Sequence, residues 1–329
     1  MVQTDYDLVS SIIIPYPERF YNDYDLLTNF FEELITLIPN NIKIWAITNN
    51  QQSINKLNHK FSYKNIDFIG LRGWDEIWLR DCIGFIKDDT IVKPIYDPKY
   101  CQCEGDKEYY KKLNGLSNTI VKECIQKEIK SLNLVLDGGN FVCNDKYVFM
   151  TDKVYEDNKV YTKKEIDSTI FQSTNLEPII IERNKFDVIG HMDAYLSFID
   201  NNRAILASYP NFPFLKEDIS FIEKLKQRLE QLGICIINMQ DRPVDELANY
   251  GIDGKKADFS SARGNYLNYL RINNTIILPE YSLPTKKETQ YYNTVNQEIL
   301  EALGFEVLRI NCDQLAKLGG VLHCVSFTL

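Results

Sequence analysis

A block of polar and apolar stretches in a fixed order recurs along the chain. In each block a polar residue precedes an apolar stretch, a turn of Asn and Asp residues follows, and a second apolar stretch comes after the turn. Apolar stretches joined by such residues are typical of β-hairpins, because Asn and Asp tolerate the positive φ of tight turns. We therefore predict hairpins at 83–92, 140–150, 195–206 and 266–278. The polar residues that lie seven or eight positions before the turns are Asp81, Asp137, Asp193 and Asn265.

Between the hairpins, apolar residues recur at spacings of three and four, which predicts helices with one buried face. The predicted helices cover 24–38, 118–131, 217–232 and 286–303. Gly233 and Gly304 follow the last two, as expected of residues just past a helix end.

A fifth block, 319–329, reaches the end of the chain before its hairpin can close, so we expect 11–15 to supply the missing strand. Five strand, hairpin and helix units joined head to tail predict a five-fold pseudo-symmetric α/β propeller. No stretch rich in Pro, Gly or Ser divides the sequence, which favours a single domain over 1–329.

Composition narrows the class of protein. The 329 residues are 44% hydrophobic and 25% charged, as in ordinary globular proteins, and no apolar run reaches the roughly 18 residues of a membrane span. A net charge of −9 without a basic block argues against nucleic-acid partners. The N-terminus lacks the features of a signal peptide, so we expect a cytoplasmic protein. Self-association into a homo-oligomer stays open.

The eight cysteines are expected to be free thiols, as is usual in a reducing compartment. Cys101 and Cys103 are too close for a usual zinc pair, and no Cys/His quartet has ligand spacing, so we predict no metal and no cofactor.

Side chains that could take part in catalysis lie within the repeated blocks. Each has an ordinary explanation when taken alone: Cys324 as a buried thiol, His191 as a core histidine, Asp81 as half of a surface ion pair, and Asp137 as a turn residue. Taken together with Asp193, they occupy the same phase of the repeat, so we expect them to converge on one axis. No basic residue stands at an equivalent position.

That set of groups suits a particular substrate chemistry. Two carboxylates facing one pocket match a planar cation that makes bidentate contacts, which describes a guanidinium. A thiolate beside the cation can attack its central carbon. An imidazole can protonate the leaving nitrogen and later activate water, while a third carboxylate fixes the imidazole.

Several strings of the sequence resemble those of the agmatine deiminase and bacterial-type peptidylarginine deiminase family, guanidino-group-modifying enzymes of pentein fold. The strings are Asp75-Glu76-Ile77-Trp78-Leu79-Arg80-Asp81, Asp137-Gly138-Gly139-Asn140, Gly190-His191-Met192-Asp193 and Gly319-Gly320-Val321-Leu322-His323-Cys324. They occur in the family's order, and Asn265-Tyr266-Leu267-Asn268-Tyr269 resembles its penultimate hairpin.

The resemblance implies a role for each residue. Cys324 is the nucleophile that forms a thiouronium intermediate with loss of ammonia, His191 is the acid and base, and Asp81 and Asp193 grip the guanidinium. Asp137 stands where the family usually has a Glu that orients the histidine, and its side chain is one methylene shorter. The residues expected to contact the substrate besides the two gripping aspartates are Trp78, Asn265 and Arg263.

The leading hypothesis is deimination of agmatine to N-carbamoylputrescine, with a small cationic guanidino compound as the partner. Arg263 and the altered 152–162 loop motivate an alternative, citrulline-forming deimination of free or peptidyl arginine. An amidinotransferase would use the same residues. A non-catalytic guanidinium-binding homologue is a fourth hypothesis, motivated by Asp137.

Overall fold

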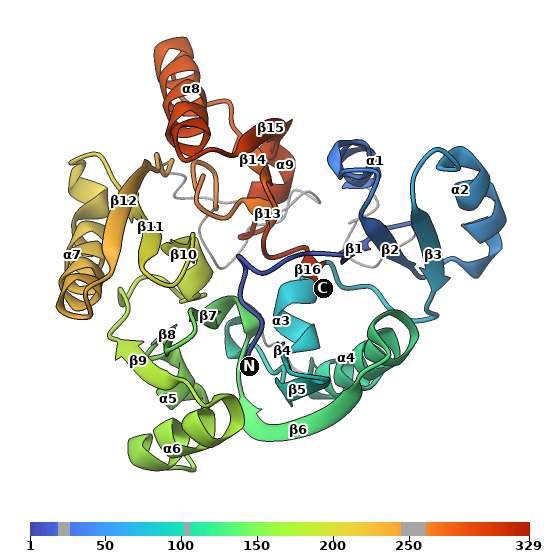
Figure 1. The fold of residues 1–329 in the computed structure, drawn as a ribbon, viewed down its shortest axis with the longest axis horizontal. Coiled ribbons are helices and arrows are strands. Elements are labelled where there is room, and N and C mark those ends of the chain that lie inside the picture. Colours follow the sequence, from blue (N-terminus) through green and yellow to red (C-terminus); the bar gives the residue numbers. More distant parts are fainter. Residues whose placement is uncertain (19–26, 102–105, 245–260) are drawn as a thin grey trace. The chain divides into compact units, whose positions relative to one another are not determined.

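The computed structural model describes residues 1–18, 27–101, 106–244 and 261–329. Figure 1 shows these residues as a ribbon coloured along the sequence. By their internal contacts they form two compact units. Unit 1 contains Met1–Asp7 and Asp81–Asp245, and unit 2 contains Leu8–Arg80 and Glu246–Leu329. The single domain predicted from the sequence remains a prediction.

Within the described part of unit 1, three small sheets share one topology, in which a short antiparallel pair is extended by a parallel strand. Their strands are β4 (Phe85–Lys87), β5 (Thr90–Ile95) and β6 (Glu128–Val135); β7 (Val142–Cys143), β8 (Tyr147–Thr151) and β9 (Glu177–Ile181); and β10 (Leu196–Phe198), β11 (Arg203–Ser208) and β12 (Cys235–Gln240). The three predicted hairpins of this unit are therefore confirmed.

Unit 2 repeats the same topology in the residues that are described. One sheet contains β13 (Leu270–Ile272), β14 (Thr275–Glu280) and β15 (Glu306–Asn311), and the other has the order β16 (Phe327–Thr328), β1 (Ser11–Pro15), β2 (Lys43–Thr48) and β3 (Ile66–Gly70). Strand β16 pairs antiparallel with β1, placing Phe327 opposite Ile13. The predicted pairing of the two chain ends is thus confirmed.

Parallel neighbours need a crossover connection, and helices supply it. The crossover helices are α1 (Thr28–Leu37), α2 (Ile54–Lys60), α4 (Asp106–Ile120), α5 (Lys153–Asp157), α6 (Lys163–Thr174), α7 (Lys216–Gln231) and α8 (Lys286–Ala302). The short helices α3 (Leu79–Ile83) and α9 (Asp313–Ala316) precede β4 and β16 instead. Helices α7 and α8 confirm the predictions at 217–232 and 286–303. Gly233 and Gly304 follow them with positive φ values of 73° and 94°. Helix α1 covers the described part of 24–38, and residues 24–26 lie outside the described residues.

The helix predicted at 118–131 is confirmed over 118–125, but its end is wrong. Helix α4 begins earlier, continues as a short π-helix over Val121–Ile125, and stops where Gln126 adopts a left-handed φ of 57°. The chain then enters β6, where Leu132 and Leu134 are buried and Asn133 is exposed. Parallel pairing with β5 therefore overrides a helical spacing that the sequence shows only locally.

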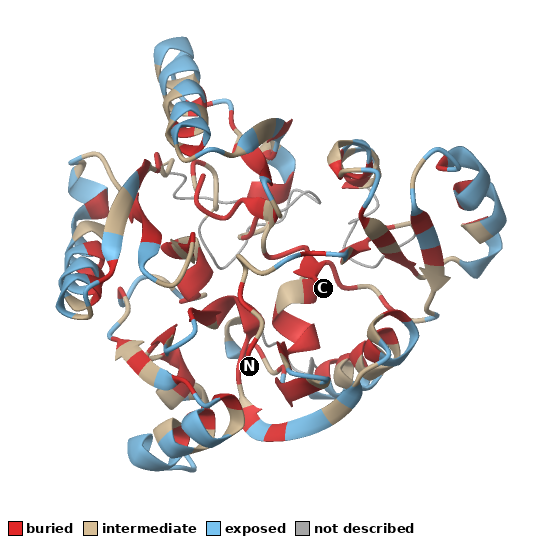
Figure 2. Cartoon of the chain, in the orientation of Figure 1, coloured by how far each residue is buried: buried red, intermediate tan, exposed pale blue. Residues whose placement is uncertain are grey.

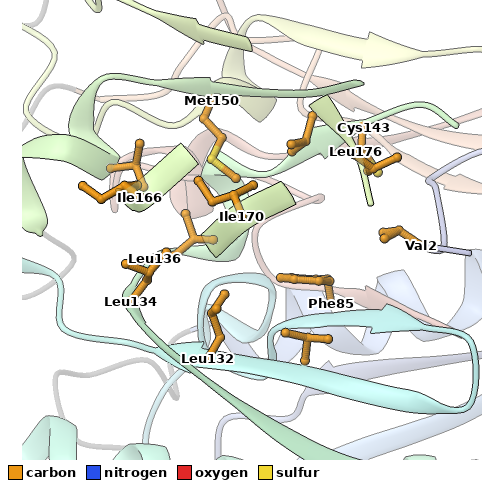
Figure 3. Packing of buried hydrophobic residues seen from close by; sticks show 13 residues of the cluster. Val2, Phe85, Leu132, Leu134, Leu136, Cys143, Met150, Ile166, Ile170 and Leu176 are labelled. Carbon is orange, nitrogen blue, oxygen red and sulfur yellow. The ribbon is translucent and has the colours of Figure 1, made fainter. Parts of the chain in front are cut away.

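A hydrophobic cluster joins the first two sheets of unit 1 (Figure 3). Leucines of β6 pack with Val148 and Met150 of β8 and with Ile166 and Ile170, one turn apart on α6. Val154 of α5 belongs to the same cluster. Figure 2 shows the general pattern: the middle strands β5, β8, β11 and β14 are mostly buried, the outer strands β6, β12 and β15 are mostly exposed or half-buried, and helices are exposed on one side. Packing of α5 and α6 on these strands holds the ends of β7 and β8 in place, and the chemical groups lie at those ends.

Candidate active site

The predicted chemical residues of unit 1 lie in short helical turns that precede the first strand of each sheet. Asp81 lies in α3, Asp137 begins the 3-10 turn Gly138–Asn140, and His191 begins the 3-10 turn Met192–Ala194, which contains Asp193. The sequence placed the first apolar residues after each of them in strands, so the predicted strands begin too early. In the structure these turns hold the polar residues, and β4, β7 and β10 start one or two residues later than predicted.

Thr151, the last residue of β8, ties two of these turns together. Its backbone N–H donates to Oδ1 of Asn140 at 2.8 Å, and its hydroxyl donates to the carbonyl of Gly190 at 2.6 Å. Gly190 has a left-handed φ of 63°, which glycine adopts without strain, and His191 follows it. The Asp-Gly-Gly-Asn and Gly-His motifs are therefore fixed to one strand end.

Gly139 marks the point on which the chemical groups converge. A Cβ atom at this position would lie 2.7 Å from Nδ1 of His191, 3.0 Å from Oδ1 of Asp81 and 3.2 Å from Oδ1 of Asp193. The backbone N–H of Gly139 donates to Oδ1 of Asp81 at 2.8 Å. The structure thus confirms that an imidazole and two carboxylates meet at one place, and it shows why a glycine stands there.

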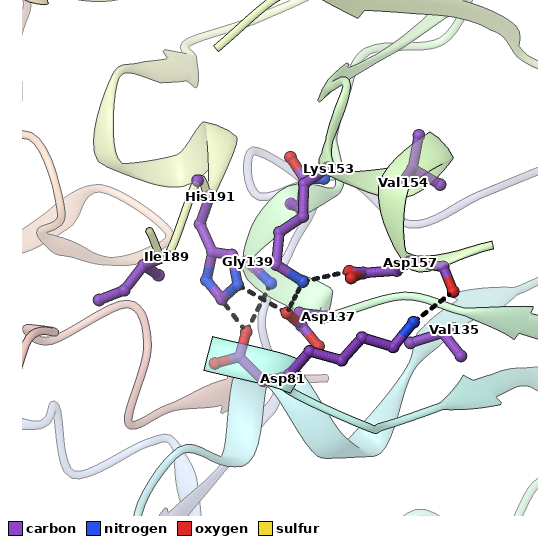
Figure 4. A network of polar contacts seen from close by, with 12 residues as sticks. Asp81, Val135, Asp137, Gly139, Lys153, Val154, Asp157, Ile189 and His191 are labelled. Carbon is purple, nitrogen blue, oxygen red and sulfur yellow. Dashed lines mark hydrogen bonds and ion pairs between the residues drawn. The ribbon is translucent and has the colours of Figure 1, made fainter. Parts of the chain in front are cut away.

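Asp137 holds the imidazole directly. Its Oδ2 lies 2.9 Å from Nε2 of His191, while Nδ1 of His191 lies 3.6 Å from Oδ1 of Asp81 (Figure 4). All three side chains are nearly completely buried, and His191 is 4% exposed. The aspartate side chain, although one methylene shorter than glutamate, is long enough to orient the histidine.

Burial and charge shift the pKa values of this cluster. Burial raises the pKa of Asp81 to about 6, with His191 opposing the rise and Asp137 and Asp193 adding to it. Burial alone would lower the pKa of His191, but Asp81, Asp137 and Asp193 outweigh it and raise that pKa to about 9. The imidazole is therefore protonated at neutral pH and ready to act as an acid.

The sequence interpretation missed Lys153. Its ammonium is buried, donates to Oδ2 of Asp137 at 2.8 Å, and also donates to Asp157 one helical turn later. Burial alone would raise the pKa of Asp137, but Lys153 and His191 lower it below its usual range. No basic residue stands at an equivalent position of the repeat, but Lys153 reaches the carboxylates from α5, outside that position. The available signal was the spacing of Lys153 and Asp157 four residues apart, which is typical of a paired helix face.

Cys324 lies in unit 2 and is 8% exposed. Its thiol donates to Oδ1 of Asn268 at 3.4 Å, and its carbonyl accepts the backbone N–H of Arg80 at 3.1 Å. Along the chain, Arg80 directly precedes Asp81.

Trp78 packs beside the cysteine. A Cβ atom on Gly320 would lie 2.5 Å from Cζ3 of Trp78 and 3.2 Å from Cβ of Cys324, so the missing side chain lets the indole approach closely. Trp78 is half-buried, as suits an aromatic surface that a ligand can contact.

The other two predicted contact residues of unit 2 have different neighbours. Oδ1 of Asn265 accepts the backbone N–H of Asn268 at 3.1 Å, and it is Asn268 that touches Cys324. Nε of Arg263 lies 3.3 Å from Oδ1 of Asp313, and the guanidinium also donates to the carbonyl of Ser282. Their roles toward a substrate remain predictions. Asn268 lies inside the motif Asn265-Tyr266-Leu267-Asn268-Tyr269. The sequence pattern favoured Asn265 instead, because Asn265 has the expected distance of seven or eight residues from the turn.

In the described ranges, no group of three or more His, Cys, Asp or Glu side chains is arranged to hold a metal ion. None of the helices in the described residues is long and apolar enough to cross a bilayer. The described cysteines with free thiols are Cys82, Cys124, Cys143, Cys235, Cys312 and Cys324. Cys103 lies outside the described residues.

Solved structures share this fold. Agmatine deiminase from C. jejuni is 16% identical with a TM-score of 0.75, covering 100% of this chain and 96% of that chain. Agmatine deiminase from Enterococcus faecalis is 15% identical with a TM-score of 0.75, covering 99% and 94%. A dimethylarginine dimethylaminohydrolase is 11% identical with a TM-score of 0.55, covering 98% and 100%. These likenesses confirm the predicted pentein class of α/β fold.

None of the curated protein sequences matches this chain. The sequence profile of the Porphyromonas-type peptidyl-arginine deiminase family matches residues 3–329, which include every motif described above. The chain therefore belongs to the Porphyromonas-type peptidyl-arginine deiminase family.

Proposed function

We propose that this protein hydrolyses a small guanidino compound, with agmatine as the first substrate to test, and releases ammonia. The observation that carries the proposal is the convergence of His191, Asp81 and Asp193 around Gly139. Two buried carboxylates beside a protonated imidazole suit a bound cation whose nitrogen must leave with an added proton. Family membership supports the same reaction class.

The first half of the reaction replaces a nitrogen by sulfur. Asp81 and Asp193 accept hydrogen bonds from the guanidinium N–H groups, and the Cys324 thiolate forms a bond to the central carbon. The C–N bond then breaks while His191 gives its proton to the leaving nitrogen, so that ammonia departs and an S-alkylthiouronium remains. This step needs Cys324 of unit 2 and the cluster of unit 1 to act on the same guanidinium.

The second half returns the enzyme to its starting state. His191, now neutral, takes a proton from water as the water oxygen bonds to the same carbon. Breaking of the C–S bond releases the thiolate and a ureido product, so one guanidinium and one water yield one urea group and one ammonium. Asp137 keeps the imidazole oriented through both halves.

Substrate choice is tested by comparing agmatine, free arginine and an arginine-containing peptide in one ammonia-release assay. We expect agmatine to give the highest kcat/KM, because the Arg263 guanidinium that could hold a substrate carboxylate is engaged by Asp313. Detection of N-carbamoylputrescine identifies the product. Faster turnover of arginine would move the assignment to a citrulline-forming deiminase, and tight binding of all three without product would leave only a guanidinium-binding protein.

The pH dependence of kcat/KM follows from the cluster. We expect a bell-shaped profile with limbs near pH 6 and pH 9. Asp81, with a pKa of about 6, loses its grip on the cation when it is protonated. His191, with a pKa of about 9, loses the proton it must donate when the pH rises further. The measurement is initial rate at low substrate concentration from pH 5 to 10, with recovery of activity at pH 7.5 as the control for unfolding. A profile without either limb would contradict these protonation roles.

A further inference from the structure

Lys153 is a buried cation next to the reaction cluster. It is the first residue of α5 and is only 3% exposed. Burial removes the water that would surround the ammonium, so the charge needs partners within the protein. The next residue, Val154, packs in the hydrophobic cluster of unit 1, which fixes the start of the helix. The lysine side chain therefore has a defined direction, toward Asp137 (Figure 4).

Lys153 and His191 share one carboxylate oxygen. Oδ2 of Asp137 lies 2.8 Å from Nζ of Lys153 and 2.9 Å from Nε2 of His191. The second oxygen, Oδ1, is buried without a hydrogen-bond partner among the described residues. Every ionic contact of Asp137 in that part of the chain therefore passes through Oδ2, and without Lys153 only the imidazole would hold this side chain.

The charge of Lys153 also acts on the imidazole. The groups that face His191 from the neighbouring elements are Asp81, Asp137, Asp193 and the ring of Tyr100, whose centroid lies 6.0 Å from the imidazole. Lys153 reaches the imidazole's surroundings through the shared Oδ2 of Asp137. Three carboxylates stabilise the imidazolium, whereas Lys153 destabilises it by like charge. An imidazolium held too strongly would be a poor acid toward the leaving nitrogen, because proton transfer weakens as the acid's pKa rises above the working pH.

We propose that Lys153 is a positioning residue, which fixes Asp137 against His191 and keeps the imidazolium able to release its proton. This inference rests on the proposed deiminase function for its catalytic meaning, but not for its electrostatic effect. A purely structural lysine would contribute to folding and leave the titration of His191 unchanged.

The test is the titration of His191 in the full chain, followed by NMR of the histidine rings in the wild type and in Lys153→Met. Nζ of Lys153 lies 2.8 Å and Nε2 of His191 2.9 Å from the same oxygen, so the two charges are close. At an effective dielectric constant of about 20, two unit charges at such short range interact strongly enough to shift a titration by about one pH unit or more. We therefore expect the His191 midpoint to rise by about one pH unit or more in Lys153→Met. The same spectra record the rings of His59 and His323, so a change confined to His191 is distinguished from a change in the whole protein.

Two further variants address folding and charge. Lys153→Arg keeps the cation and should restore a near-wild-type midpoint. Lys153→Met combined with Asp157→Asn removes one buried cation and one buried anion, so it offers a folded alternative if the single variant unfolds; its shift should be smaller and of the same sign. Lys224→Met is the matched control, since Lys224 pairs with Glu182 on the surface of the same unit at 3.0 Å.

Turnover provides the second readout. With the best substrate of the wild type, Lys153→Met should lower kcat at neutral pH by about tenfold and leave KM within about twofold, because the gripping carboxylates are untouched. The alkaline limb of the pH profile should move up with the NMR midpoint. An unchanged His191 midpoint in a folded Lys153→Met protein overturns the inference while the proposed function stands. A shifted midpoint in a protein that turns over none of the guanidino substrates supports the electrostatic role and overturns the proposed function instead.

Discussion

Replacement of Cys324 with alanine is expected to lower ammonia release by roughly 10⁴-fold or more, because the thiouronium intermediate cannot form without the sulfur. The substitution removes a single sulfur atom from a small side chain, so the fold should survive it. The measurement is steady-state ammonia release with agmatine, together with a thermal melt followed by circular dichroism.

Cys312→Ala is the matched control in the same unit. Cys312 is fully buried, and burial, helped by Asp313, raises its thiol pKa well above the usual value, so it is an inert structural thiol. We expect a slightly lower melting temperature and unchanged turnover. Retained ammonia release in Cys324→Ala, or an equal loss in Cys312→Ala, would remove the nucleophile assignment.

Substitution of Gly139 by alanine should disable the carboxylate and imidazole cluster. The new Cβ atom would lie 2.7 Å from Nδ1 of His191 and 3.0 Å from Oδ1 of Asp81, well inside ordinary contact distance, so one or both side chains must move. A misplacement approaching 1 Å at a reaction centre costs about 10²-fold in rate. Overpacking of this kind also lowers the free energy of unfolding, typically by about 1–3 kcal/mol.

Gly115→Ala separates this effect from the general consequence of adding a methyl group. Gly115 lies on the exposed side of α4, where a Cβ atom would meet nothing within 4 Å. Alanine should stabilise that helix by about 0.5–1 kcal/mol and leave kcat/KM unchanged. Chemical denaturation and the ammonia assay report both quantities. Full activity in Gly139→Ala would show that the three groups do not work at the positions seen here.

Much of the fold and part of the site could be predicted because their signals are local. Asn and Asp turns between apolar stretches determined the four hairpins, and the spacing of apolar residues with a following glycine determined α7 and α8. The repeat then placed Asp81, Asp137, His191 and Asp193 in equivalent positions, which is why their convergence in unit 1 was expected.

Contacts between distant segments decided the rest. Residues 128–131 carry a helical spacing, yet parallel pairing with β5 makes them a strand, because a whole ladder of hydrogen bonds outweighs a weak local preference. Asn268 rather than Asn265 touches Cys324, since the strand there begins only at Leu270 and the preceding loop redirects the side chains.

Lys153 shows the difference most clearly. In the sequence it is one of several lysines in a polar stretch, and its spacing of four residues from Asp157 indicates only a paired helix face. Its importance arises from the hairpin of β7 and β8, which returns the chain to the turn of Asp137, and from Val154, which anchors α5 in the core. The sequence by itself determined which chemical groups the cluster of unit 1 contains. Only the tertiary structure decided which cation balances them, because an ion pair depends on distances that residue order does not specify.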